Sequence, residues 1–450
     1  MYLTKFHINY NHKNKTFLFN YINSSIIQLD KYKYVNMKKG IFNDLDKKEI
    51  IDLVNQGFLF PKNIDKEIAE KIFFESYKKA LNKSDILHVS FYVTDYCNLR
   101  CNYCMLLGEL NQNHMSQKTA NGILKFIQKI KNVNEKLNFI QLQYTGGEPF
   151  LNKKILYHLI EKNNLIFKDI KKVNTITTNG TINLNHNDID FINKNNIILK
   201  ITFNLHHYED INRLDINGKN KNEDILKNIK NIIDMGIKNK IQISSAYTYP
   251  KIKKEYESNE KYKNKVIEKF KEYNININKI NFRLDKNIVI FDTKYGYSNE
   301  NSVNRKYSNL KNWVKEVNDE NQYDVKKIFK RLNQSFCCCA FKEGKILNFD
   351  TLGNIRNLIP QYNNKKFWVG NYNDNFEYII EKIAENKKNN AKWMNDEICQ
   401  KCPKLTKCFG GCVERYEAKN LKPSENCNND FIIFLDKLRL KKILQKLGEI

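Results

Sequence analysis

Three cysteines fall within eight positions in the stretch TDYCNLRCNYCM, residues 94–105, directly after a run of alternating apolar residues. Thiolates hold iron–sulfur clusters, and short spacings let several of them converge on one cluster. Cys97, Cys101 and Cys104 would bind three of four irons and leave one iron open. An open coordination position is what separates catalytic from structural metal sites. The stretch therefore predicts a catalytic iron–sulfur site.

Two other interpretations of these thiols remain: a zinc site completed by a distant His or Cys, and thiols that bind nothing. Zinc motifs usually contain paired Cys-x2-Cys ligands. Here the spacing is Cys-x3-Cys-x2-Cys, at the end of a strand-like run. Because α/β folds place their chemistry at strand ends, the context favours the iron–sulfur site.

The elements that must position the cysteines are predicted from residues 86–285, where strand-like runs alternate with amphipathic helical patterns. Such alternation indicates an α/β fold, a parallel sheet with crossover helices. Six repeats favour a partial (β/α)6 TIM-like barrel, and a doubly wound open sheet is the alternative. The six runs are ILHVSFYV, FIQLQYT, VNTITT, IILKITFN, KIQISSAY and KINFRL.

The next two strand ends also carry chemically useful residues. LQYTGGEPFL ends the second run, and TITTNGTI ends the third. Glycines such as Gly146 and Gly147 let the backbone approach a ligand closely. The Glu148 carboxylate can accept hydrogen bonds from an ammonium group.

Together these motifs resemble those of radical S-adenosylmethionine (SAM) enzymes. CNLRCNYC is similar to that superfamily's signature, including an aromatic residue, Tyr103, before the third cysteine, and GGEP matches a second motif. The resemblance implies that the open iron chelates the amino and carboxylate groups of SAM. Reductive cleavage of SAM would then give a 5′-deoxyadenosyl radical that abstracts hydrogen from the substrate, while the protein supplies binding and orientation.

The resemblance also implies a set of SAM contacts. Glu148 is expected to bind the amino group, and TNG at Thr178 to Gly180 is similar to a stretch of the same enzymes. KITFNLHHYEDINRLDINGK loosely resembles a further motif, in which Arg213 is retained and suits a carboxylate. The expected SAM-binding residues are Tyr103, Gly146, Gly147, Glu148, Pro149, Thr178, Asn179, Asn204 and Arg213. The sequence does not identify a residue that acts on the substrate.

A second group of cysteines lies in CQKCPKLTKCFGGC, residues 399–412. It resembles the SPASM domain, which carries one or two auxiliary iron–sulfur clusters, and a zinc ribbon is the alternative. By that resemblance one auxiliary cluster is held by Cys399, Cys402, Cys408 and Cys427.

The other auxiliary cluster would use Cys412 and Cys339, with Gly353 fitting the pattern that follows. Leu358, however, stands where the family has a cysteine. Substitution by Cys337 or Cys338, an open iron, or no cluster are the alternatives.

Five segments are expected along the chain: a small α+β domain (1–82), the partial barrel (83–290), a linker (291–334), the SPASM domain (335–430) and a C-terminal helix (431–450). The first resembles winged-helix-like peptide-recognition domains, which add a leader peptide to a sheet edge. A simple packing extension is the alternative. The last contains an apolar stripe at helical spacing, which predicts packing: Phe431, Phe434, Leu435 and Leu438.

The chain has 450 residues and a formal net charge of +26, mostly from dispersed Lys. Without a dense Arg-rich patch this indicates a solvated basic surface rather than a nucleic-acid face. An acidic peptide would suit it. No window reaches the roughly 18–20 apolar residues of a membrane span, and the N-terminus lacks a secretory signal. We expect a cytoplasmic protein, in which clustered cysteines bind metal.

These observations predict a peptide maturase that forms a thioether or carbon–carbon crosslink in a ribosomally made precursor peptide. The expected partners are that peptide, with an acidic leader, and an electron donor such as flavodoxin or ferredoxin, with no membrane and no nucleic acid. One alternative is an enzyme similar to anaerobic sulfatase maturases. Ile359 counts against it, because that family has Asp there. A zinc-containing nucleic-acid-binding protein is the alternative from another class.

Overall fold

The structure is a computed structural model, and its chain forms two compact units, each described below by itself. The first comprises residues 1–77, 298–339 and 387–450, and the second comprises residues 78–297 and 340–386. In the part of the chain described, no helix is long and apolar enough to cross a membrane. The described residues are 1–78, 85–101, 104, 113–203, 205, 213–244, 259–283, 324–333, 346–356, 368–389, 391–410, 422–426 and 429–450.

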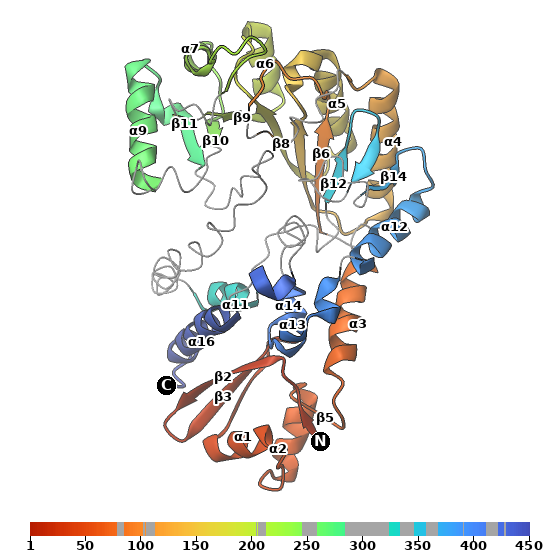
Figure 1. Cartoon of the computed structure of the whole chain (residues 1–450), viewed down its shortest axis with the longest axis vertical. Coiled ribbons are helices and arrows are strands. Elements are labelled where there is room, and N and C mark those ends of the chain that lie inside the picture. The colour runs from red at the N-terminus through yellow and green to blue at the C-terminus, as the bar shows by residue number, and fades with distance from the viewer. Residues whose placement is uncertain are drawn as a thin grey trace. The chain divides into compact units, whose positions relative to one another are not determined.

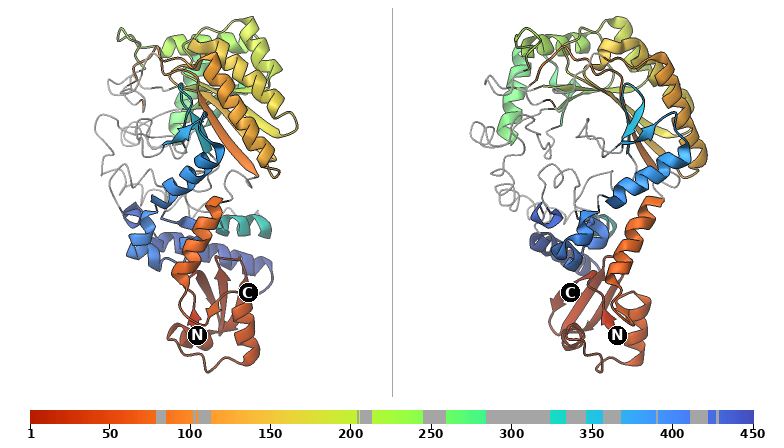
Figure 2. Two further views of the ribbon diagram at one scale, coloured as in Figure 1. Left: turned by 90° about the vertical axis from the view of Figure 1, so that its right-hand side faces the viewer. Right: turned by 45° about the vertical axis from the view of Figure 1, so that its right-hand side comes forward.

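The second unit is built on a curved parallel sheet (Figure 1). Its six parallel strands pair with their neighbours in chain order, and the helices lie on the convex side (Figure 2). This sequential order confirms the predicted α/β partial barrel and excludes the doubly wound alternative. The strands are β6 (Ile86–Tyr92), β7 (Phe139–Thr145), β8 (Lys171–Thr178), β9 (Ile197–Thr202), β10 (Ile241–Ser244) and β11 (Ile280–Arg283).

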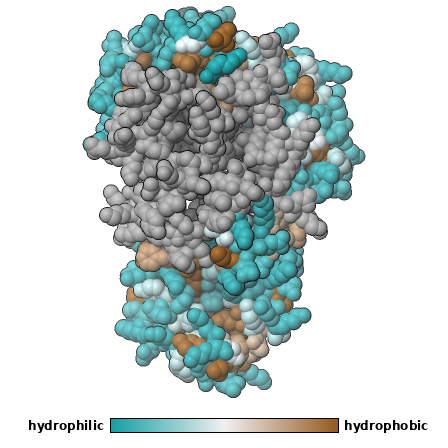
Figure 3. All heavy atoms as spheres, in the orientation of Figure 1, coloured by the Kyte–Doolittle hydropathy of each residue, from teal (hydrophilic) through white to brown (hydrophobic). Residues whose placement is uncertain are grey.

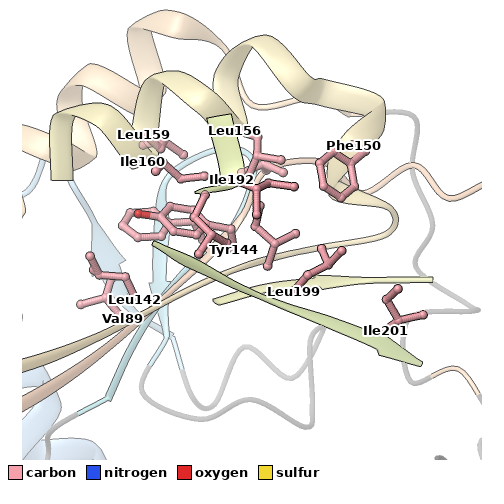
Figure 4. Close-up of a cluster of buried hydrophobic side chains, with 14 of the residues drawn as sticks. Val89, Leu142, Tyr144, Phe150, Leu156, Leu159, Ile160, Ile192, Leu199 and Ile201 are labelled. Atoms are coloured by element: carbon pink, nitrogen blue, oxygen red, sulfur yellow. The ribbon is translucent and has the colours of Figure 1, made fainter. Parts of the chain in front are cut away.

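Amphipathic helices cover this sheet because their apolar residues recur at helical spacing. Helix α4 starts where the Ser116 side chain accepts a hydrogen bond from the Thr119 N–H, and it buries Ile123 and Ile127 completely. Tyr144 of β7 is buried among apolar side chains of the sheet and the helices (Figure 4). The helices are α4 (Gln117–Val133), α5 (Lys153–Ile166), α6 (His186–Lys194), α7 (Asn222–Asp234) and α9 (Asn259–Glu272).

A later segment of the chain extends the sheet beyond β6. Strand β12 (Ile346–Phe349) pairs parallel to β6, and β13 (Asn354–Arg356) and β14 (Trp368–Asn371) continue antiparallel before α12 (Phe376–Asn389). The Tyr372 ring, just after β14, packs directly on Gly122 of α4. A Cβ at position 122 would lie 2.0 Å from this ring, so the contact requires glycine there. The cysteine loop after β6 therefore starts beside a strand from the C-terminal half of the chain.

The first unit contains a three-stranded antiparallel sheet, ordered β2-β3-β4. A two-stranded pairing of β1 with β5 accompanies it, together with helices α1, α2 and α3 of the N-terminal segment. Helix α2 begins with a capping box between Asp46 and Glu49. The bounds are β1 (Tyr2–Leu3), β2 (His7–His12), β3 (Lys15–Asn20), β4 (Ile26–Asp30), β5 (Leu59–Phe60), α1 (Lys31–Lys38), α2 (Lys47–Asn55) and α3 (Asp65–Lys78).

The C-terminal helix packs on this sheet. Helix α16 (Asn429–Lys446) contacts α11 (Val325–Asn333) and β2 and buries Leu440 and Ile443 against strand residues. The predicted stripe is only partly right: Leu435 is buried, but the Phe434 side chain is 48% exposed. The packed face of α16 also includes Asp436, whose carboxylate accepts a hydrogen bond from the Tyr21 hydroxyl.

The second cysteine segment also belongs to the first unit. It folds as short helices η6 (Lys392–Asn395), α13 (Glu397–Lys401), α14 (Leu405–Cys408) and η7 (Pro423–Asn426). The Phe73 ring of α3 lies edge-on to Trp393 and Phe409, with centroids 5.3 and 5.1 Å apart. Cys399 and Cys402 join this cluster. Residues near the N-terminus and the cysteine segment therefore share one apolar core.

The surface of the described residues is mostly hydrophilic on the face shown in Figure 3, and hydrophobic residues appear there in small, scattered groups. An excess of dispersed Lys fits such a solvated surface.

We predict that Phe73→Ala lowers the free energy of unfolding of the first unit by about 3–5 kcal/mol, because it leaves a cavity between Trp393 and Phe409. Ile51→Ala, at a side chain 52% exposed in the same unit, is the control and should stay within about 0.5 kcal/mol. Urea denaturation followed by circular dichroism measures both. Equal effects of the two variants would contradict the shared core.

Candidate functional site

The predicted site residues of the second unit gather at the carboxyl ends of β6, β7 and β8. Cys97 follows β6, Gly146 to Glu148 follow β7, and Thr178 ends β8. The three strands pair parallel, so these ends meet at one edge of the sheet. This is where a barrel of this kind places its chemistry.

The two glycines after β7 bring its end against the cysteine loop. The Gly147 N–H donates to the Thr94 carbonyl at 2.8 Å, and the Glu148 N–H donates to the Tyr96 carbonyl at 2.9 Å. A Cβ on Gly147 would lie 2.1 Å from the Tyr96 oxygen. The close approach expected of these glycines is thus made to the chain's own backbone, one residue before Cys97.

The Glu148 carboxylate is fully buried and fixes the ends of β7 and β8 together. One oxygen accepts from the Thr178 hydroxyl at 2.8 Å and the Phe150 N–H at 3.2 Å, and the other accepts from the Asn179 N–H at 2.7 Å. Burial raises the pKa of Glu148 to about 7, although these hydrogen bonds and the charge of Arg213 lower it. Pro149 follows at the start of η2 (Pro149–Asn152) and is buried.

Arg213 approaches the same point from the segment after β9. Its side chain is 1% exposed, and Nη2 donates to the Asn179 carbonyl at 2.7 Å. The next residue, Leu214, accepts from the Arg100 N–H at 2.7 Å. The Arg213 segment is therefore bound both to the end of β8 and to the cysteine loop.

The Cys97 thiol is in contact with this network. It accepts from the Leu99 N–H at 3.4 Å and from the Asn179 side-chain amide at 3.7 Å. Burial raises the pKa of Cys97, while these two hydrogen bonds lower it. The Cys104 N–H donates to the Cys101 carbonyl at 3.0 Å, which turns the loop back on itself.

Cys97, Cys101 and Cys104 are brought to one loop. Among the residues described, no three Cys, His, Asp or Glu side chains are close enough together to hold a metal ion. Two predicted SAM contacts, Tyr103 and Asn204, lie outside the described residues.

In the first unit, Cys399 lies within α13, Cys402 is the C-cap residue of that helix, and Cys408 ends α14. The side chain of Asp396 caps α13 by accepting from the Cys399 N–H at 3.1 Å. Burial raises the pKa of Cys402 to about 11, and the Lys404 N–H and its charge lower it. Other cysteine-site residues of the prediction lie outside the described residues: Cys337, Cys338, Cys339, Cys412 and Cys427, with Leu358 and Ile359.

The sequence analysis missed the buried partners of these loops. Thr351, in the turn after β12, donates to the Asp95 carboxylate at 2.7 Å, two residues before Cys97. Lys404 forms a buried ion pair with Asp436 of α16. The sequence offered one sign of these contacts: Asp95 and Lys404 each lie within two residues of a predicted cysteine ligand.

Residues 91–262 match the Radical SAM superfamily. The GTP 3',8-cyclase of Actinobacillus pleuropneumoniae serotype 5b (strain L20) is 32% identical over 168 residues, which are 36% of this chain and 46% of that protein. The GTP 3',8-cyclase of Staphylococcus epidermidis (strain ATCC 12228 / FDA PCI 1200) is 32% identical over 159 residues, 34% of this chain and 43% of that protein. The chain thus spans less than half the length of these relatives.

Among solved structures, native anSMEcpe with bound AdoMet and Cp18Cys peptide aligns with a TM-score of 0.52 at 18% identity. The alignment covers 82% of this chain and 100% of that chain. At this identity the likeness shows a shared fold.

We predict that Thr178→Val lowers the free energy of unfolding by about 2 kcal/mol, because the buried Glu148 carboxylate loses a donor. That donor lowers the pKa of Glu148, so its loss raises the pKa further. The unfolded carboxyl ionises near its ordinary value of 4.5. The penalty should therefore grow as the pH rises through about 7.

Thr177→Val is the matched control, since the neighbouring Thr177 hydroxyl is only half-buried and accepts from Gln143. It should change the unfolding free energy by less than about 0.5 kcal/mol at every pH. Guanidinium denaturation at pH values below and above 7 measures both variants. A pH-independent loss for Thr178→Val would count against the Glu148 interaction.

Proposed function

We propose that this chain, whose residues 91–262 form a radical SAM domain, is an enzyme that modifies a peptide. The cofactors of such a domain are a 4Fe–4S cluster and SAM. When bound, they supply the one-electron cleavage of SAM and, from it, abstraction of a substrate hydrogen. The observation that carries the proposal is the cysteine loop held by backbone hydrogen bonds to Gly147 and Glu148 at the end of parallel strands.

The residues at this edge fit the cofactors by the chemistry of their donors. Cys97, Cys101 and Cys104 would hold three irons, because thiolates are the ligands that iron–sulfur clusters take. Glu148 and Arg213 lie beside the loop with charges opposite to the ammonium and carboxylate of SAM. The Gly146–Pro149 segment and Thr178 would fix the position of that pair.

We further propose that the first unit holds an auxiliary cluster through Cys399, Cys402 and Cys408, with Cys427 as the fourth ligand. Cys412 and Cys339 would serve a second auxiliary cluster. The buried Lys404 beside Cys402 fits this role, since its charge offsets the negative charge of a thiolate-bound cluster.

A peptide is the substrate class that the first unit favours. Strand β4 is an edge of the three-stranded sheet, so its outer side can accept an added strand. The +26 charge suits an acidic leader. The structural neighbour anSMEcpe was solved with a peptide bound, which makes a peptide the first substrate to test. The expected product is a thioether or carbon–carbon crosslink in a ribosomally made precursor, with flavodoxin or ferredoxin as electron donor.

A nucleotide is the second candidate substrate, because GTP 3',8-cyclases are the relatives at 32% identity. That similarity covers 36% of this chain, and the radical SAM match at residues 91–262 lies within the second unit, so the peptide remains our first choice. The radical SAM match also favours either enzyme over a zinc-containing nucleic-acid-binding protein.

We expect anaerobically reconstituted protein to contain four or more irons per chain and to form 5′-deoxyadenosine from SAM under dithionite. Cys101→Ala should abolish that product, because one ligand of the SAM-binding cluster is lost. Cys399→Ala should lower the iron content but leave some SAM cleavage. Iron analysis and liquid chromatography measure both. Unchanged cleavage by Cys101→Ala, or a protein that holds only zinc, would overturn the proposal.

Substrate class is tested by presenting both candidates to the wild-type enzyme. Coexpression with a short precursor peptide encoded beside this chain should give a peptide that has lost two hydrogens, as mass spectrometry would show. GTP should be recovered unchanged and should not raise deoxyadenosine formation. Consumption of GTP without any change in the peptide would favour the nucleotide alternative.

A further inference from the structure

We propose that the side-chain amide of Asn179 donates a hydrogen bond to the Cys97 sulfur and thereby raises the reduction potential of the cluster bound there. This inference rests on the proposed function, because it requires Cys97 to be a cluster ligand. It assigns Asn179 a role toward the cluster in place of a direct role toward SAM.

The backbone of Asn179 is fixed on both sides. Its N–H donates to the buried Glu148 carboxylate at 2.7 Å, and its carbonyl accepts from Arg213 Nη2 at 2.7 Å. Both partners are almost completely buried, with exposures of 0% and 1%. The end of β8 is therefore held at a defined position beside the cysteine loop.

The side chain of Asn179 has only one orientation that satisfies its neighbours. The Thr181 N–H, which can only donate, lies 2.9 Å from Asn179 Oδ1. The carbonyl end of the amide therefore faces Thr181, and the NH2 end faces the cysteine loop. There Nδ2 donates to Asn98 Oδ1 at 2.8 Å and to Cys97 Sγ at 3.7 Å.

Asn98 closes the network. Its own amide donates to the Thr181 hydroxyl at 2.8 Å, and that hydroxyl donates to Asn179 Oδ1 at 2.6 Å. This ring of three side chains holds the Asn179 donor in place beside Cys97. Asn98 is the residue after Cys97, so the network is anchored directly beside the sulfur in the chain.

A donor held in this way changes the electrostatics of the sulfur. Reduction adds one electron to the cluster, supplied in the test by dithionite, and increases the negative charge on its sulfurs. An N–H dipole aimed at a sulfur stabilises the reduced form more than the oxidised form. Partial burial of Cys97 strengthens the effect, because water screens it less. The Leu99 N–H acts in the same direction.

The test is an anaerobic redox titration of the full-length, reconstituted protein, followed by electron paramagnetic resonance. The signal that changes on addition of SAM identifies the cluster at the Cys97 loop. Asn179→Leu removes the donor and should shift the midpoint of this signal to a more negative potential, with iron content unchanged. Asn179→Asp keeps the acceptor for Thr181 but places a negatively charged oxygen near Cys97. It should therefore shift the midpoint to a still more negative potential than Asn179→Leu does.

Asn228→Leu is the matched control. Asn228 donates to the carbonyl of Gly180 at 3.0 Å, so it supports the same turn without contacting Cys97. Its midpoint should equal that of wild type. An unchanged midpoint in both Asn179 variants, or the same shift in the control, would overturn the inference. If Asn179→Leu fails to retain iron, the midpoint potential measured for Asn179→Asp tests the inference instead. A wild-type protein without a SAM-responsive signal would overturn the proposed function itself.

Discussion

The short backbone contact between the end of β7 and the start of the cysteine loop is the constraint on which the site depends. The parallel register of β6 and β7 places Tyr92 beside Thr145, and the chain then brings the Gly147 and Glu148 N–H groups to the carbonyls of Thr94 and Tyr96. Any side chain on Gly147 would push this backbone apart. The polar network from Glu148 to the thiol can form only because this contact fixes the loop.

Much of this site could be predicted from sequence because its determinants are local. Period-two apolar runs identified the strands, and each motif lies at the end of one of them. Since parallel strands end at one edge, the motifs had to meet. What sequence could not predict are contacts between segments far apart, such as Thr351 with Asp95, 256 positions away. These depend on how whole elements pack, which no local pattern records. The exposed Phe434 shows the same limit, because helical spacing alone does not say which face will pack.

The two cysteine segments are stabilised in different ways. Cys97 lies in a network of amides and hydroxyls, which orient donors toward its sulfur. Cys402 lies in an aromatic cluster with Phe73 and Trp393, where Lys404 supplies a buried positive charge. A polar network fixes direction, whereas an apolar cluster excludes water. Under the proposed function, the first arrangement would suit a cluster that binds a further ligand, and the second would suit a cluster shielded from water.

The shared core of the first unit connects its antiparallel sheet to the second cysteine segment through direct contacts. Tyr21, which follows β3, donates to Asp436 of α16, and Asp436 pairs with Lys404 in the second cysteine segment. The sheet and the cysteines therefore belong to one folded body, without an intervening linker. A strand added at the outer edge of β4 would pair with β4, whose other edge pairs with β3, the strand that leads to Tyr21. The sheet and the cysteine segment are thus joined through buried contacts, and a close-packed core of this kind resists compression.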